Sequence, residues 1–133
     1  MNILTFDIED WWAYDHYKYG NKKDYLPRLN KYLNDIVDLL DERSFQATFF
    51  CLGIIAREYP EIIKLIDSRG HQIACHSDMH AFLQDKNQDF FYQDTKEAID
   101  SLEQVIGKKI TAYRAPAFSF IEKNKWTFEV LYD

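Results

Sequence analysis

The feature that most constrains the fold of this sequence is a regular alternation of short apolar runs with longer segments of helical periodicity. Four runs have the length and composition of β-strands, and they cover residues 2–7, 45–50, 71–75 and 109–114. Each is followed, directly or after a loop, by a segment with the pattern of a helix. This alternation predicts an α/β fold in which a parallel sheet carries helices outside it, either as an open doubly wound sheet or as part of a barrel.

The helices are predicted from apolar spacing and from residues that start and stop helices. The first has apolar residues at spacings of three and four from Leu29 to about Glu42, with Pro27 in its opening turn. A short helix passes through residues 54–55, a third runs from Pro60 to Gly70, a fourth covers 89–106 before Gly107, and another begins within 121–132. The order is therefore βαβαβαβα, in one domain that spans residues 1–133.

Composition narrows the class of protein. A chain of 133 residues with 47% hydrophobic and 29% charged residues is long and apolar enough for one globular core. The formal net charge of −6 and the scattered basic residues argue against a general nucleic-acid binder, which needs a basic patch. No run is long enough to span a membrane, and the first residues lack the regions of a signal peptide, so we expect a cytoplasmic location.

Acidic, imidazole and guanidinium side chains follow the predicted strands at their carboxyl ends. In chain order they are Asp7, Glu9, Asp10, His76, His80 and Arg114. Ligands bind at the carboxyl ends of the strands in both open and closed parallel α/β folds. We therefore expect these side chains to form one functional rim.

The two histidines of the segment ACHSDMH suggest a metal site. His76 and His80 are four residues apart and lie on one face if the segment is helical or turn-like. Two imidazoles and a carboxylate make a catalytic zinc set that leaves a position open for water, whose pKa zinc lowers to about 7. The simpler alternative is a pair of surface histidines beside a solvated acidic turn. The carboxylates of the first strand end favour a divalent metal, with zinc as the expected ion.

Asp7 directly follows the apolar run ILTF, where a carboxylate is costly unless it is paired. Arg114 is the expected partner, through two hydrogen bonds of its guanidinium fork that would keep Asp7 ionised and oriented. Positions 7 and 9 of an extended chain point the same way, so one carboxylate could hold a metal while the other acts as a base. Asp78 is expected to cap a helix rather than to bind metal.

The cysteines and an aromatic loop are further candidate features. Cys51 and Cys75 lie in or beside apolar runs, so we expect two buried free thiols. Aromatic residues make up 17% of the chain, and several gather in WWAYDHYKY, residues 11–19. This loop could stack on the apolar faces of sugar rings or simply pack as a cover.

The segments TFDIED, HSDMH and RAPAFSF, in this order and at these separations, resemble motifs of the polysaccharide deacetylase family, also called the NodB-homology or carbohydrate esterase 4 group. ATFFCLG is similar to the second strand of that family. The resemblance covers essentially the whole chain. It implies part of a distorted, TIM-like (β/α)7 barrel, with about four βα units present, and metal-dependent hydrolysis of N-acetyl groups on the amino sugars of a glycan.

The resemblance also implies roles for individual residues. Asp7 resembles the catalytic base, and Arg114 resembles the residue that orients this base. His76 and His80 resemble metal ligands. TFDIEDWW and RAPAFSF further resemble a subgroup tied to the biosynthesis of surface glycans.

The third metal ligand is left open between two residues. The common family motif, TFDD, has two adjacent acids, whereas Ile8 follows Asp7 here. Either Glu9 or Asp10 must then take the ligand role. We slightly prefer Asp10, although the strand geometry favours Glu9.

The general acid of the family, a histidine on a later strand, has no counterpart in this sequence. His16 lies in the first long loop, and His71 opens the third strand at the wrong end. We therefore expect the N-terminal portion of a deacetylase domain, poorly active alone and prone to self-associate through an open barrel edge. Two alternatives are a non-catalytic remnant that binds metal or glycan, and an α/β interaction domain whose rim residues form only salt bridges.

Overall fold

A computed structural model describes residues 3–10, 13 and 28–132, and its centre is a parallel sheet of three strands. The strands are β1 (Thr5–Ile8), β2 (Thr48–Cys51) and β3 (Gln72–Cys75). They lie side by side in chain order, with Asp7 opposite Phe50 and Phe50 opposite Ala74. A doubly wound sheet reverses its strand order at a switch point, whereas this sheet continues in one direction. The described strands are therefore arranged as a segment of an α/β barrel.

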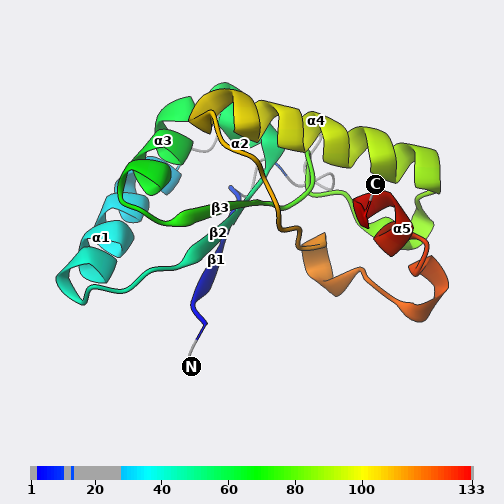
Figure 1. Cartoon of the computed structure of the whole chain (residues 1–133), viewed down its shortest axis with the longest axis horizontal. Coiled ribbons are helices and arrows are strands. Elements are labelled where there is room, and N and C mark those ends of the chain that lie inside the picture. The colour runs from blue at the N-terminus through cyan, green and yellow to red at the C-terminus, as the bar shows by residue number, and fades with distance from the viewer. Residues whose placement is uncertain (1–2, 11–12, 14–27, 133) are drawn as a thin grey trace.

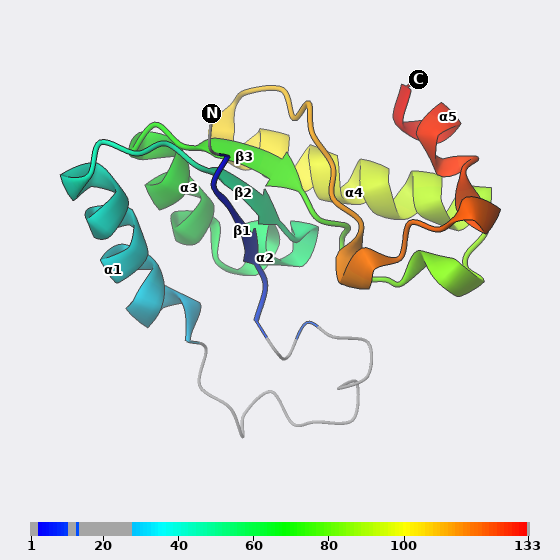
Figure 2. The ribbon, with the colours of Figure 1, turned by 90° about the horizontal axis from the view of Figure 1, so that it is seen from below.

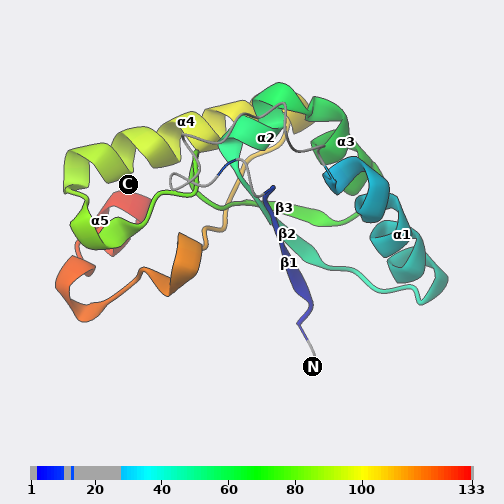
Figure 3. The ribbon, with the colours of Figure 1, turned by 180° about the vertical axis from the view of Figure 1, so that it is seen from behind.

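Helices cover one face of this sheet. Figure 1 shows α1, α3, α2 and α4 as an arc above the strands, and Figure 3 shows the same arc from behind. In Figure 2 the strands lie in front of α2, α3 and α4. The helices are α1 (Leu29–Glu42), α2 (Gly53–Glu58), α3 (Pro60–Ser68), α4 (Gln88–Ile106) and α5 (Thr127–Tyr132). All helices between consecutive strands are thus on the same side, as in the outer layer of a barrel.

The hydrophobic core lies between the sheet and this helical layer. Val37 of α1, Ile63 of α3 and Phe49 of β2 are fully buried in it. Full burial of a side chain of this size contributes about 1.5–3 kcal/mol relative to exposure. Because strand residues alternate between faces, Phe49 and Cys51 enter this core, while Phe50 and its register neighbour Asp7 occupy the opposite face.

Helix α4 matches its prediction closely because both of its ends carry local signals. The Asn87 side chain accepts a hydrogen bond from the backbone N–H of Phe90, at 2.9 Å, and so caps the first turn. Gly107 ends the helix with a φ of 67°, a left-handed conformation that glycine adopts without cost. Pro27, predicted in the first turn of α1, lies outside the described residues.

The predicted strand at 109–114 is wrong in extent. Its contact with the sheet is a single bridge between Cys75 and Tyr113, with two backbone hydrogen bonds of 2.9 Å around it. The backbone N–H of Ile110 donates instead to the Glu103 carboxylate at the end of α4, at 3.0 Å. That contact with the helix draws the start of the segment out of the ladder. The other strands also begin one to three residues later than predicted.

The final helix is shorter than the predicted 121–132 segment. A 3-10 turn at Glu122–Asn124 precedes α5, which begins at Thr127. The Asn124 side chain accepts a hydrogen bond from the Ile121 N–H and donates one to the Ser119 carbonyl, each at 2.8 Å. Local bonds of this kind compete with a continuous helix. None of the described helices is both long and apolar enough to cross a membrane.

Candidate active site

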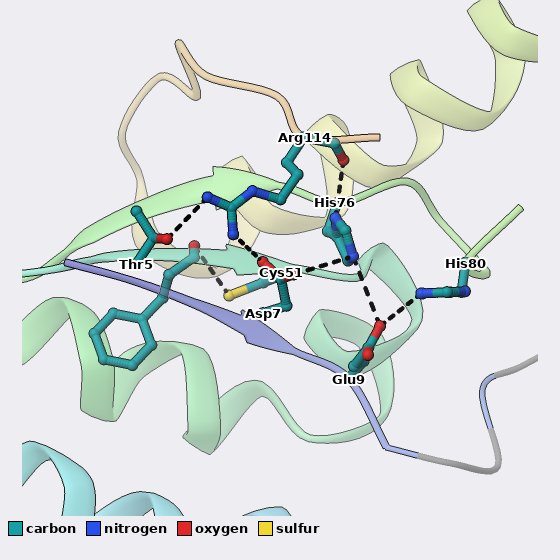
Figure 4. Close-up of polar contacts among 8 residues, drawn as sticks. Thr5, Asp7, Glu9, Cys51, His76, His80 and Arg114 are labelled. Atoms are coloured by element: carbon teal, nitrogen blue, oxygen red, sulfur yellow. Dashed lines mark hydrogen bonds and ion pairs between the residues drawn. The ribbon is translucent and has the colours of Figure 1, made fainter. Parts of the chain in front are cut away.

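Three potential metal ligands converge beyond the carboxyl ends of β1 and β3. One ligand atom each from Glu9, His76 and His80 lies within 4.8 Å of the other two. The Glu9 Oε2 atom is 2.7 Å from His80 Nε2 and 3.6 Å from His76 Nε2 (Figure 4). Both imidazoles are buried, and the Glu9 side chain is 24% exposed although its Oε2 atom is buried.

The backbone sets the orientation of the His76 ring. His76 Nδ1 lies 2.8 Å from the carbonyl oxygen of Arg114 and donates to it, since that oxygen can only accept. A neutral ring then carries its lone pair on Nε2, which faces the carboxylates of Glu9 and Asp7 at 3.6 and 3.9 Å. A lone pair that faces two carboxylates suits a bound cation, and this pairing of a ligand histidine with a carbonyl is common in metal sites.

Asp7 and Arg114 form the ion pair expected from the sequence, but with a different geometry. Arg114 Nη1 donates to Asp7 Oδ1 at 2.5 Å, and Nη2 donates to Thr5 Oγ1 at 2.9 Å (Figure 4). The expected double hydrogen bond to Asp7 is therefore wrong, because Thr5, two residues earlier on the same face of β1, takes the second nitrogen. The guanidinium carbon also lies 3.9 Å from the centre of the Phe50 ring. Asp7 keeps Oδ2 turned toward His76.

The segment that carries the histidines is an irregular turn and not a helix. Ser77 and His80 have φ angles of 72° and 58°, in the left-handed region. Such angles cost non-glycine residues of order 1–3 kcal/mol each, and they persist only where the surroundings hold them. The Ser77 hydroxyl accepts a hydrogen bond from the Ala81 N–H at 3.1 Å across the turn. This conformation directs His80 toward Glu9.

The structure places Asp10 and Asp78 away from the ligand group. Asp10 is buried, and its carboxylate accepts a hydrogen bond from the backbone N–H of Arg28, at 3.1 Å. Asp78 does not cap a helix as predicted, because both of its oxygens bind Arg57, at 2.6 and 2.8 Å. Asp10 thus joins β1 to the start of α1, and Asp78 joins the histidine turn to α2.

Cys51 and Cys75 are free, buried thiols, as predicted. They are register neighbours on β2 and β3, and both enter the helix-facing core. Burial raises the pKa of the Cys75 thiol to about 12, and burial also raises the pKa of Cys51. The raised pKa values favour the protonated thiols, and neither cysteine belongs to the group of potential ligands that Glu9, His76 and His80 form.

A groove of about 500 Å³ lies beside the carboxylate of Asp7. Residues that line it include Asp7, Phe50, His76, Tyr113, Arg114 and Phe118. Phe118 is 98% exposed, and it and Ala117 have φ angles of 53° and 51°. Two consecutive left-handed residues turn the chain so that this aromatic ring stands in solvent at the groove.

His71 does not reach this rim. His71 lies just before β3, at the opposite end of that strand from His76, and its ring packs on Phe49 with centroids 5.2 Å apart. Burial lowers the pKa of His71. His16 and the aromatic segment 11–19, apart from Ala13, lie outside the described residues.

Sequence reasoning missed Thr5, Phe50, Arg57 and Asp94 as neighbours of the site. Thr5 and Phe50 could have been found from strand alternation, since they share a face with Asp7. Arg57 and Asp94 lie on helices and meet the histidine turn only through tertiary packing. No local pattern marks them.

Comparison with known proteins gives a consistent set of similarities. The family model for polysaccharide deacetylases matches residues 3–128. The peptidoglycan-N-acetylmuramic acid deacetylase PdaA of Bacillus subtilis is 29% identical over 110 residues, which cover 77% of this chain and 42% of that protein.

Solved structures show the same fold. A Mycobacterium smegmatis protein described as a polysaccharide deacetylase is 26% identical, with a TM-score of 0.81 over 97% of this chain and 46% of that one. A mutant of BA3943, a CE4-family pseudoenzyme of Bacillus anthracis, with restored enzymatic activity, is 20% identical, with a TM-score of 0.74 over 97% of this chain and 42% of that one. The chain spans less than half the length of each of these three proteins.

Proposed function

This chain belongs to the polysaccharide deacetylase family, and from that premise we propose that it supplies the metal site and the base of an enzyme that hydrolyses N-acetyl groups on the amino sugars of a glycan. The observation that carries the proposal is the convergence of Glu9, His76 and His80 beside the paired Asp7 carboxylate. Two imidazoles, one carboxylate and an adjacent second carboxylate make a set suited to metal-assisted hydrolysis.

The donor set fits a divalent metal. Glu9, His76 and His80 would hold it, with zinc as the ion that best suits two nitrogen ligands and one oxygen ligand. We assign the carboxylate ligand to Glu9 and not to Asp10, because Glu9 lies against both imidazoles whereas the Asp10 carboxylate binds the Arg28 backbone. When bound, the metal polarises the acetyl carbonyl and lowers the pKa of water to about 7.

Asp7 acts as the general base in this proposal. Arg114 binds Asp7 Oδ1 and orients the carboxylate, which leaves Oδ2 facing the ligand group to accept a proton from the attacking water. The water oxygen attacks the acetyl carbon, the carbon–nitrogen bond breaks, and acetate and a free amine leave. Among the described residues none stands ready to protonate that amine, and we propose that the acid comes from outside the described residues.

The proposed substrate is an N-acetylated glycan that lies in the groove beside Asp7. Phe118 offers an exposed aromatic face to a sugar ring, since a pyranose presents an apolar side. The resemblance of TFDIEDWW and RAPAFSF to a surface-glycan subgroup makes such a glycan the substrate class we propose. The cytoplasmic location and self-association through an open barrel edge stay predictions.

A second candidate is a non-catalytic protein that binds metal or glycan. It is favoured by the similarity to the Bacillus anthracis pseudoenzyme fold and by the lack of a proton donor for the amine among the described residues. The two candidates differ in the release of acetate.

The test uses the protein expressed from its native gene, stripped with a chelator and reloaded with zinc. Acetate release from N-acetylglucosamine oligomers should depend on zinc and should be lost in Asp7→Asn, which keeps the three proposed ligands. His80→Ala should lose zinc and activity together. Zinc binding without acetate release would instead support the non-catalytic candidate. Failure of the unmodified protein to bind any divalent metal would refute the metal site.

A further inference from the structure

The turn between the two ligand histidines is attached to helices that take no part in the proposed chemistry. The carbonyl oxygens of Ser77 and Asp78 accept hydrogen bonds from the N–H groups of Gly53 and Ile54, at 3.1 and 3.2 Å. The N–H of Asp78 donates to the Asp94 carboxylate of α4, at 3.1 Å. The middle of the turn is thus held from α2 on one side and from α4 on the other.

Arg57 of α2 adds a side-chain clamp to the same turn. Its two terminal nitrogens bind the two oxygens of Asp78, whose side chain is 8% exposed, at 2.6 and 2.8 Å. The same guanidinium lies 2.9 Å from Ser101 Oγ, which itself donates to the Glu97 carbonyl of α4 at 2.7 Å. Arg57 therefore joins the turn, α2 and α4 in one network.

Gly53 allows this close arrangement. A Cβ atom at position 53 would stand 2.2 Å from Asp78 Oδ1 and 2.6 Å from the Cα atom of Ala98 in α4. Only a residue without a side chain lets α2 approach both the turn and α4 so closely. Gly53 lies outside the left-handed region, so the need for glycine here comes from packing and not from backbone conformation.

The conformation of the turn explains why it needs such support. Ser77 and His80 hold left-handed φ angles of 72° and 58°, which the backbone alone disfavours. If the turn relaxed, His80 would move away from Glu9, because His80 itself is one of the strained residues. Metal binding needs its ligands in place, so residues that hold the turn also set the affinity of the site.

We propose that Arg57, Asp78 and Asp94 are positioning residues that preorganise His76 and His80 for metal binding, by clamping the intervening turn to α2 and α4. This inference rests on the proposed function, because it assigns these residues a role in the same metal site. The role proposed for this partly buried ion pair is geometric, because it holds the turn in the conformation that presents both histidines.

The variants Arg57→Lys and Asp78→Asn test the clamp. Lysine keeps the positive charge but cannot span both oxygens of Asp78 and the Ser101 hydroxyl, and asparagine removes the charge with little change in shape. The matched control is Arg69→Lys. Arg69 also binds two carboxylates, Asp38 and Asp41, and its side chain is 35% exposed against 34% for Arg57, but it lies on the far side of the fold between α1 and α3.

All measurements are made on the protein expressed from its native gene. Competition with a chromogenic chelator gives the dissociation constant for zinc, and cobalt substitution reports the ligand geometry by its visible absorption. We expect zinc affinity to fall at least tenfold in Arg57→Lys and Asp78→Asn, with altered cobalt bands, and to stay within twofold in Arg69→Lys. Hydrogen exchange at residues 77–81 of the metal-free protein should be faster in the first two variants only.

The possible results separate this inference from the proposed function. Unchanged zinc affinity and unchanged exchange in Arg57→Lys and Asp78→Asn would overturn the positioning role. Equal losses of thermal stability in Arg57→Lys and Arg69→Lys, without a change in zinc affinity, would also overturn it. The ion pair of Arg57 with Asp78 would then contribute only to stability. If the unmodified protein bound no zinc, the proposed function would fail, and the exchange data alone would decide whether the clamp holds the turn.

Discussion

Gly53→Ala gives the sharpest prediction for how the fold supports the site. The new methyl group would stand 2.2 Å from an oxygen of Asp78 and 2.6 Å from the backbone of α4, both well inside the 3.4 Å at which ordinary contact begins. Neither neighbour can yield easily, because Asp78 is clamped by Arg57 and the Ala98 Cα belongs to a helix. Either α2 moves away or the clamp opens.

The size of the effect follows from three opposing contributions. Overpacking costs about 1–3 kcal/mol, and weakening of a charge-assisted hydrogen bond costs about 1.5–3 kcal/mol. The higher helix propensity of alanine returns at most about 1 kcal/mol, because Gly53 is the first residue of α2. We expect a net loss of about 2–4 kcal/mol in the free energy of unfolding, which lowers Tm by roughly 10 °C in a chain of this size.

Gly107→Ala is the matched control for this prediction. Gly107 has a φ of 67°, and a methyl group on it would meet none of the described atoms within 4 Å, so alanine there introduces backbone strain without a clash. That strain costs about 1–2 kcal/mol. Thermal unfolding followed by circular dichroism should show the larger drop in Tm for Gly53→Ala, and zinc affinity should fall in this variant only. A Gly53→Ala protein as stable as Gly107→Ala would refute the close-packing argument.

Three further predictions concern the rim and its surroundings. Burial raises the pKa of Asp94 to about 6, and the charged groups around it are Asp78, Glu97 and Arg57. The folded protein therefore loses up to about 3 kcal/mol in the free energy of unfolding as Asp94 ionises between about pH 4 and pH 6. Asp94→Asn should remove this loss of stability. The free energy of unfolding by urea should then change less between pH 4.5 and 7.5 in this variant than in the unmodified protein. Arg114→Lys should lower kcat for deacetylation about 10–100-fold with a small change in KM, because lysine cannot bind Asp7 and Thr5 together; an unchanged kcat would exclude the orienting role. Phe118→Ala should raise KM for glycan oligomers without lowering Tm, since its ring is solvent-exposed; equal KM values would exclude stacking there.

Local sequence determined much of the architecture. The spacing of apolar residues and the Asn87 and Gly107 caps specify α4 almost to the residue, because these interactions lie within the helix itself. Alternation along β1 places Asp7 on the face opposite the core, and chain order places His76 at the same rim. The rim could be predicted because parallel strands align their carboxyl ends.

Tertiary structure alone decided how the residues at that rim are connected. Glu9 rather than Asp10 meets the histidines because the start of α1 binds the Asp10 carboxylate, a contact that spans 18 residues of chain. The single bridge at Tyr113 and the clamp of Arg57 on Asp78 likewise depend on where helices pack. Periodicity specifies which face a residue occupies, whereas the choice between neighbouring carboxylates depends on ångström-scale positions that only the packed helices and turns define.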